Sequence, residues 1–176
     1  MYHDHPACPS ISGNLEAIDQ GLELCKQLDS TSYNHKALPF VQSSIGEHLR
    51  HIIDLYFALI NQAKIGVVDY DHRRRGALVE TDLQTGISET QQIETWLKGL
   101  KESDLDKPVT ILSEASIASQ QVCEVPSTLR RELLFVSSHT IHHFALMKVI
   151  TTHCKIETNE HLGYAPATAT YLRGQA

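Results

Sequence analysis

Apolar residues recur at intervals of three and four along much of this chain, the spacing that places side chains on one face of an α-helix. A first helix is predicted over about residues 11–30, after a Ser-x-Gly-Asn start suited to an N-cap. A second is predicted from Pro39 or Ser43 to Ala63, with a wider apolar face. The first part of the chain is therefore expected to contain two helices.

Two more helices are predicted further along the chain. The third begins near Ser88, which can cap it together with Gln91 three residues on, and apolar residues follow at core spacing. The fourth follows Pro126, with Ser127 as its expected cap, and continues to about Ile150. These four helices are the main elements that the pattern predicts.

Between the third and fourth helices the period changes to two. PVTILSE and IASQQVCEV have alternating or β-branched residues around a polar turn near residues 114–116, which predicts a β-hairpin. Residues 65–83 have no sustained period and are predicted to form a loop with at most a short helical turn. A loop of that length in a compact domain is often functional or forms a subunit contact.

These elements predict an all-α fold, a four-helix bundle with a small β-hairpin between helices three and four. A chain of 176 residues suits one domain, so residues 1–176 are expected to form a single unit. Residues 1–10 and about 160–176 are expected to be irregular tails, with at most a short turn of helix after Pro166.

Composition narrows the classes of function. A net charge of -6 leaves no broad basic surface for a phosphate backbone, so nucleic acid is not an expected partner. No apolar run approaches the ~20 residues of a membrane span, so no membrane association is expected. The N-terminus has neither a basic region nor an apolar region of a signal peptide, which indicates the cytoplasm. The four cysteines are scattered without CxxC pairing, which fits reduced thiols.

One basic run interrupts this acidic composition. Arg73, Arg74 and Arg75 are consecutive in the predicted loop, and acidic residues flank them on both sides. A solvated loop or an intramolecular cluster of ion pairs is the first interpretation. The second is an anion-binding or dimer-contact element near a functional site.

The most informative feature is the cluster of histidines in VSSHTIHHFALMK. His139 and His143 are four residues apart, so on a helix their side chains lie about 40° apart on one stripe. Apolar residues at helical spacing turn this stripe inward, and a buried imidazole pair needs hydrogen-bonding or ligating partners. A divalent transition metal is such a partner. His142 points about 60° away from His139, which indicates a supporting or surface position.

A catalytic metal site uses three protein ligands and an open position, so a third donor is needed. The second helix offers His48 and His51 within SIGEHLRHIIDLY. The helical wheel favours His48, which lies about 60° closer to the apolar midline than His51 does. A site in a groove at the edge of the bundle would favour His51 instead.

SIGEHLRHIID, followed far downstream by SSHTIHHFALMK, resembles the DinB/YfiT-like superfamily of proposed metal-dependent enzymes, which is unrelated to the DNA polymerase of the same name. Its members place one histidine about seven residues after a Ser/Thr-Val/Ile pair and just before an apolar dipeptide. The pair that begins at Ser44 and the dipeptide after His51 match this frame, so the resemblance selects His51 over His48. HTIHH resembles the second element of the family and selects His139 and His143.

The resemblance implies an antiparallel four-helix bundle, a divalent metal such as nickel or zinc, and a homodimer. Some relatives are thiol transferases or thiol-dependent isomerases, which implies a low-molecular-weight thiol as a possible cosubstrate. The expected function is a metal-dependent hydrolase or thiol S-transferase that acts on a small molecule. In such an enzyme the metal would activate water or a thiol, and His48 or His142 would shuttle protons. The alternative is a non-catalytic, metal-binding or partner-binding bundle with a stress-related role.

Overall fold

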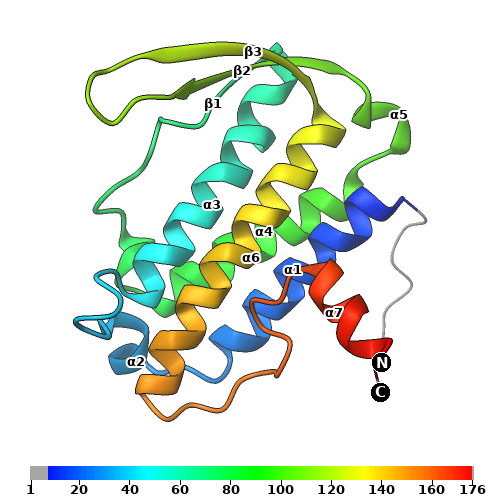
Figure 1. Cartoon of the computed structure of the whole chain (residues 1–176). Coiled ribbons are helices and arrows are strands. Elements are labelled where there is room, and N and C mark those ends of the chain that lie inside the picture. The colour runs from blue at the N-terminus through cyan, green and yellow to red at the C-terminus, as the bar shows by residue number, and fades with distance from the viewer. Residues whose placement is uncertain (1–7, 176) are drawn as a thin grey trace.

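Helices make up most of the structure (Figure 1). The computed structural model describes residues 8–175. Its long helices are α1 (Pro9–Cys25), α3 (Ile45–Gln62), α4 (Leu83–Gly99) and α6 (Leu129–His153). Helix α1 packs against α4 and α6, and α3 packs against the same two helices. The prediction of a mostly helical fold with a small amount of sheet is confirmed.

Shorter helices connect these elements. Helix α2 (Ser30–Asn34) follows α1, and α5 (Glu102–Leu105) follows α4. The remaining short elements are the 3-10 helices η1 (Ala63–Ile65) and η2 (Leu78–Glu80) and the C-terminal helix α7 (Pro166–Arg173).

Helix α3 begins with a capping box that fixes its first residue. The Ser44 hydroxyl accepts a hydrogen bond from the Glu47 amide at 3.2 Å, and the Glu47 carboxylate accepts one from the Ser44 amide at 2.7 Å. The apolar face that follows is buried in the core, including Ile52, Tyr56 and Leu59. This face determines where the two α3 histidines point.

The other predicted helix starts need correction. Helix α4 begins five residues before Ser88, because the Asp82 carboxylate accepts a hydrogen bond from the Thr85 amide at 2.8 Å and caps the helix there. Helix α6 is capped by Thr128 rather than by Ser127. For α4 and α6 the observed cap belongs to the same residue class as the predicted one. Helix α1 begins at Pro9, before the predicted Ser-x-Gly-Asn start, and its N-terminus has no side-chain cap.

The sheet has three strands in the order β1-β2-β3. Strands β2 (Pro108–Glu114) and β3 (Val122–Thr128) form the predicted hairpin. Strand β1 (Val67–Asp69) pairs parallel with β2 inside the segment that was predicted as a loop. Three residues are too few to show a period, which explains the error. Pro126 lies within β3 rather than ending it, on an edge strand where a missing amide is tolerated.

A buried carboxylate joins the sheet to α6. Glu132 is fully buried and accepts hydrogen bonds from the Tyr70 hydroxyl at 2.8 Å and the Ser127 hydroxyl at 2.6 Å. Burial and this contact raise the pKa of Tyr70. These contacts therefore hold the N-terminal end of α6, which precedes His139 in the sequence, against the sheet.

The C-terminal segment packs against the outside of α6 (Figure 1). Gly163 has φ +80°, and a Cβ there would lie 2.6 Å from the Cα of Ala145, so this approach requires glycine. Residues 160–176 were expected to be irregular with at most one helical turn. Helix α7 is longer than one turn, so that part of the prediction was wrong; residues 1–7 of the other predicted tail lie outside the described residues.

Helix α6 is the one helix in the described part of the chain that could cross a membrane by length and apolar composition alone. Core helices of soluble proteins pass the same test. Here α6 packs against α1 and α3.

Candidate metal centre

Helices α3 and α6 pack side by side and bring together histidines that are far apart in sequence. His51 Nε2 lies 2.9 Å from His139 Nε2, although the residues are 88 positions apart. His143 Nε2 lies 3.0 Å from the same His139 atom. Three imidazole nitrogens therefore meet at one point, within 4.8 Å of one another, and form a group that could hold a metal ion.

Hydrogen bonds between the three imidazoles cannot satisfy all of the ring nitrogens that meet here. Each ring nitrogen of a neutral imidazole carries either one hydrogen or one lone pair. The single site on His139 Nε2 faces both neighbouring nitrogens, so it can make only one good hydrogen bond. A divalent cation accepts lone pairs from all three nitrogens at once, and neutral imidazole is a preferred ligand of such ions. The donor set therefore fits a transition metal.

His48 lies behind this group and contacts the other side of one ring. Its Nδ1 is 2.9 Å from the Nδ1 of His143, whereas His143 Nε2 faces His139. Metal-binding histidines commonly use their second nitrogen in this way, because the contact fixes the ring orientation and the tautomer. The structure thus distinguishes the two α3 histidines, and His51 is the one that joins the three-histidine group.

Two ring atoms have no partner among residues 8–175. His48 Nε2 and His51 Nδ1 are both buried and make no hydrogen bond. An unpaired buried polar atom costs free energy in an apolar interior. Such atoms at a cluster of four imidazoles indicate that the site is built for more than packing.

All four imidazoles are held in the neutral form. Burial is the main reason that the pKa of His51 falls to about 3, and the nearby Arg73 charge lowers it further. Burial, followed by the neighbouring His51, lowers the pKa of His143 to about 2. Burial likewise lowers the pKa values of His139 and His48. Neutral imidazole is the form that binds metal, so the environment favours ligation at neutral pH.

His142 lies at the rim of the group. It is exposed, and its ring centroid is 5.3 Å from that of His143 and 6.0 Å from that of His139. This position agrees with the supporting role predicted from its rotation on the helix. His142 faces solvent, whereas His48 is buried and contacts His143.

An aromatic residue beside the group was not predicted. The Phe135 ring lies 5.8 Å from the His139 ring, and the Arg131 guanidinium lies over Phe135 at 5.5 Å. Phe135 precedes His139 by four residues, so the helical spacing could have identified it. It forms an apolar wall on one side of the histidines.

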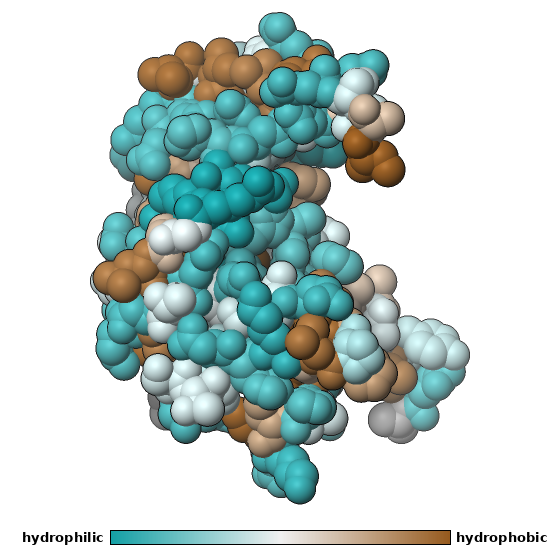
Figure 2. Space-filling model, turned by 90° about the vertical axis from the view of Figure 1, so that its left-hand side faces the viewer, coloured by the Kyte–Doolittle hydropathy of each residue, from teal (hydrophilic) through white to brown (hydrophobic). Residues whose placement is uncertain are grey.

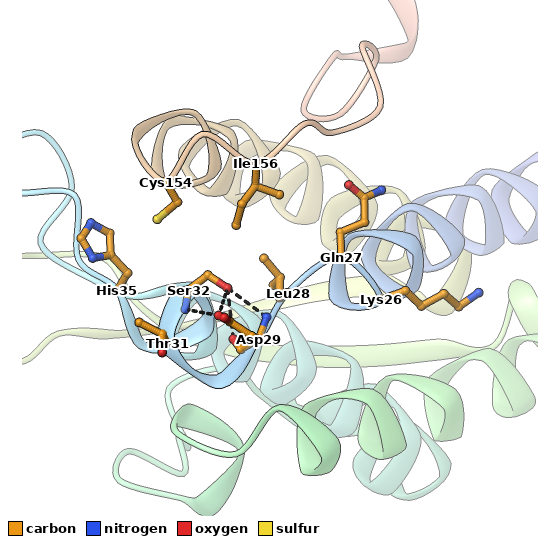
Figure 3. Close-up of a pocket in the computed structure, with 9 residues that line it drawn as sticks. All are labelled: Lys26, Gln27, Leu28, Asp29, Thr31, Ser32, His35, Cys154 and Ile156. Atoms are coloured by element: carbon orange, nitrogen blue, oxygen red, sulfur yellow. Dashed lines mark hydrogen bonds between the residues drawn. The ribbon is translucent and has the colours of Figure 1, made fainter.

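One cavity lies away from these histidines. It has a volume of about 510 Å³ and lies between the end of α1, helix α2 and the segment after α6 (Figure 3). At its edge His35 Nε2 contacts His153 Nδ1 at 2.9 Å, a pair for which no role was predicted. A second cavity of about 420 Å³ lies between α6 and the C-terminal segment. Neither cavity is lined by His51, His139 or His143.

The comparisons with known proteins agree with this geometry. The family model of the DinB superfamily matches residues 16–147, which include all of the clustered histidines. The chain belongs to the DinB superfamily. The resemblance noted in the sequence is thereby confirmed.

Two relatives extend the comparison. A crystal structure of a DinB-like protein, YjoA, from Bacillus subtilis superposes with a TM-score of 0.63 at 21% identity, over 88% of this chain and 99% of that one. At that identity the likeness shows the fold alone. A protein named FK506-binding protein 5 from Rhizopus delemar is 26% identical over 111 residues, which are 63% of this chain and 29% of that protein. The chain thus matches less than a third of that relative's length.

Proposed function

We propose that the protein is a metal-dependent enzyme of the DinB/YfiT type, in which His51, His139 and His143 hold one nickel or zinc ion. The convergence of three Nε2 atoms from two helices carries this proposal. It takes the four long helices as the antiparallel four-helix bundle expected for the superfamily. Three neutral ligands leave a coordination position for water or a substrate.

The proposed reaction is hydrolysis or thiol transfer on a small molecule. A bound divalent ion lowers the pKa of a coordinated water or thiol and so supplies the nucleophile at neutral pH. Of the protein's own groups, His48 would orient the His143 ring through their 2.9 Å contact. The exposed His142 would carry protons between the site and solvent. A low-molecular-weight thiol as cosubstrate, a homodimer and a cytoplasmic location away from nucleic acids and membranes belong to the same proposal.

One observation favours a second candidate, a non-catalytic metal-binding or partner-binding bundle with a stress-related role. Two cavities of about 510 and 420 Å³ lie away from the histidines, whereas substrate pockets of several hundred Å³ usually open onto the reacting centre. An ion that accepts no exogenous ligand would support this candidate.

Elemental analysis of protein purified without an affinity tag tests the metal centre. We expect one nickel or zinc per chain in the wild type and a marked loss in His51→Ala, His139→Ala and His143→Ala. The exposed His72 offers a matched control, and His72→Ala should retain the metal. Equal metal content in all five proteins would overturn the proposal.

A further inference from the structure

The basic run Arg73–Arg75 lies in the segment between β1 and η2, and its arginines differ in their contacts and exposure. Figure 2 views the molecule from the side on which this segment lies, and the face is largely hydrophilic. The three consecutive arginines are not equivalent. Arg74 is part-buried, whereas Arg73 and Arg75 are exposed.

Arg74 holds the segment against α3. Its backbone amide donates to the Asp54 carboxylate at 3.0 Å, and its Nε donates to the other oxygen of that carboxylate at 2.7 Å. Its two terminal nitrogens each donate to Glu89 at 2.9 Å. A bidentate pair of this kind fixes the direction as well as the position of the chain. Arg74 therefore forms intramolecular ion pairs, as the first interpretation of the basic run expected.

The same contacts hold the backbone of Arg73 near α3, on the side of His51. Asp54 follows His51 by three residues on α3, so the two side chains share one side of the helix. Arg73 is joined by one peptide bond to the amide that Asp54 binds. Its positive charge reaches both His51 and His139 and lowers their pKa values.

The positive charge of Arg73 is not paired with an acidic side chain among the described residues. Among residues 8–175 no hydrogen bond or ion pair involves its guanidinium, although Arg50 nearby is neutralised by Asp54 and Glu80. The acidic residue closest to His48 in sequence, Glu47, is paired with Lys36 at 3.0 Å. Three neutral imidazoles would not offset the charge of a divalent ion. Near the centre, Arg73 thus carries a positive charge that no carboxylate among residues 8–175 binds.

We infer that the substrate is a small anion, and that Arg73 binds its carboxylate or a similar anionic group while another group of the same molecule reaches the metal. Guanidinium is the side chain best suited to a planar carboxylate, because it donates two parallel hydrogen bonds. An exposed arginine on a segment fixed by its neighbour can bind such a group without reorganising the fold. This inference rests on the proposed metal centre.

Cobalt-loaded protein and two simple thiols test the inference. Mercaptoacetate carries a thiol and a carboxylate, whereas 2-mercaptoethanol carries the same thiol without the charge. Binding of each is followed through the visible absorption of Co²⁺. In Arg73→Gln the Kd for mercaptoacetate should rise about tenfold, the order expected for one charge-assisted contact, and the Kd for 2-mercaptoethanol should stay within about twofold.

The matched control is Arg75→Gln, which removes the same charge from the same exposed segment. It should leave both Kd values within about twofold of the wild type, because its charge does not act on the histidines. Equal changes in the two variants, or no change in Arg73→Gln, would overturn the role of Arg73 and leave the metal centre standing. Failure of the wild type to bind cobalt, or to respond to either thiol, would overturn the proposed catalytic centre and this inference together.

Discussion

The hydroxyl of Tyr56 donates a hydrogen bond of 2.6 Å to the side-chain oxygen of Asn14, and both residues lie fully inside the core. The Asn14 amide nitrogen in turn donates to the backbone oxygen of Leu133 at 3.0 Å. One buried amide thus joins α1, α3 and α6. The two helices that carry the histidines are linked through a third helix that carries none of them.

Asn14→Ala should lower the free energy of unfolding by about 2 kcal/mol, because it removes the buried acceptor of the Tyr56 hydroxyl and the amide that joins α1 to the Leu133 carbonyl of α6. Tyr56→Phe removes only the hydroxyl and should cost about 1 kcal/mol. Urea unfolding followed by circular dichroism measures both values. Gln91→Ala, at an exposed position of α4, should change the stability by less than about 0.5 kcal/mol. A similar effect at both amide positions would contradict the assignment.

Glu132→Ala should destabilise the protein by about 3 kcal/mol. The change strands the hydroxyls of Tyr70 and Ser127, which bind the buried carboxylate and connect the sheet to α6. Hydrogen exchange should show the loss first in the β2–β3 hairpin. Glu102→Ala, which removes an exposed carboxylate from α5, is the control and should be nearly neutral.

Zinc should stabilise the wild-type protein by about 2.7 kcal/mol at a free concentration one hundred times its Kd, since only the folded chain brings the three donors together. His143→Ala should abolish most of this gain, whereas the exposed His72→Ala should preserve it. Thermal unfolding of metal-free protein, with and without added zinc, gives the comparison. A gain that survives in His143→Ala would mean that the ion binds elsewhere.

The buried thiol of Cys25 should make the protein sensitive to alkali. Burial raises its pKa to about 12 from an ordinary value of 9.0, because the interior disfavours the thiolate. The unfolded chain therefore releases a proton above pH 9 that the folded chain retains. The resulting stabilisation is complete below pH 9 and is lost as the pH rises towards 12.

Between pH 8 and pH 10 this thiol should reduce the stability by about 1 kcal/mol. Urea unfolding at the two pH values should show a smaller difference for Cys25→Ala than for the wild type. The exposed thiol of Cys123 provides an internal reference. It should react with a thiol reagent in the folded protein, whereas Cys25 should react only on unfolding.

Much of the fold follows from periodicity. The apolar stripes of α3 and α6 span several turns, so the repeat identifies them and predicts which residues are buried. Strand β1 was missed because its three residues gain their structure from pairing with β2, a contact made 43 positions later between Val67 and Thr110. The pattern of neighbouring residues cannot predict a contact between positions so far apart in the sequence.

The histidine site was predictable in part for a related reason. Spacing alone relates His139 to His143, because both lie on one helix. The choice between His48 and His51 depends on how far α3 is turned towards α6, which the helical wheel of α3 cannot give. The wheel favoured His48, and that residue is indeed the more buried of the two. The three-histidine group is only partly buried, so the more buried of the two α3 histidines is not the one that joins it.

The division of donors between α3 and α6 also orders events during biosynthesis. A nascent chain that has produced His51 possesses one of the three donors, and the other two follow only after the strands and α4 have been made. Metal binding at the proposed centre is consequently expected late in folding, after α6 has packed against α3.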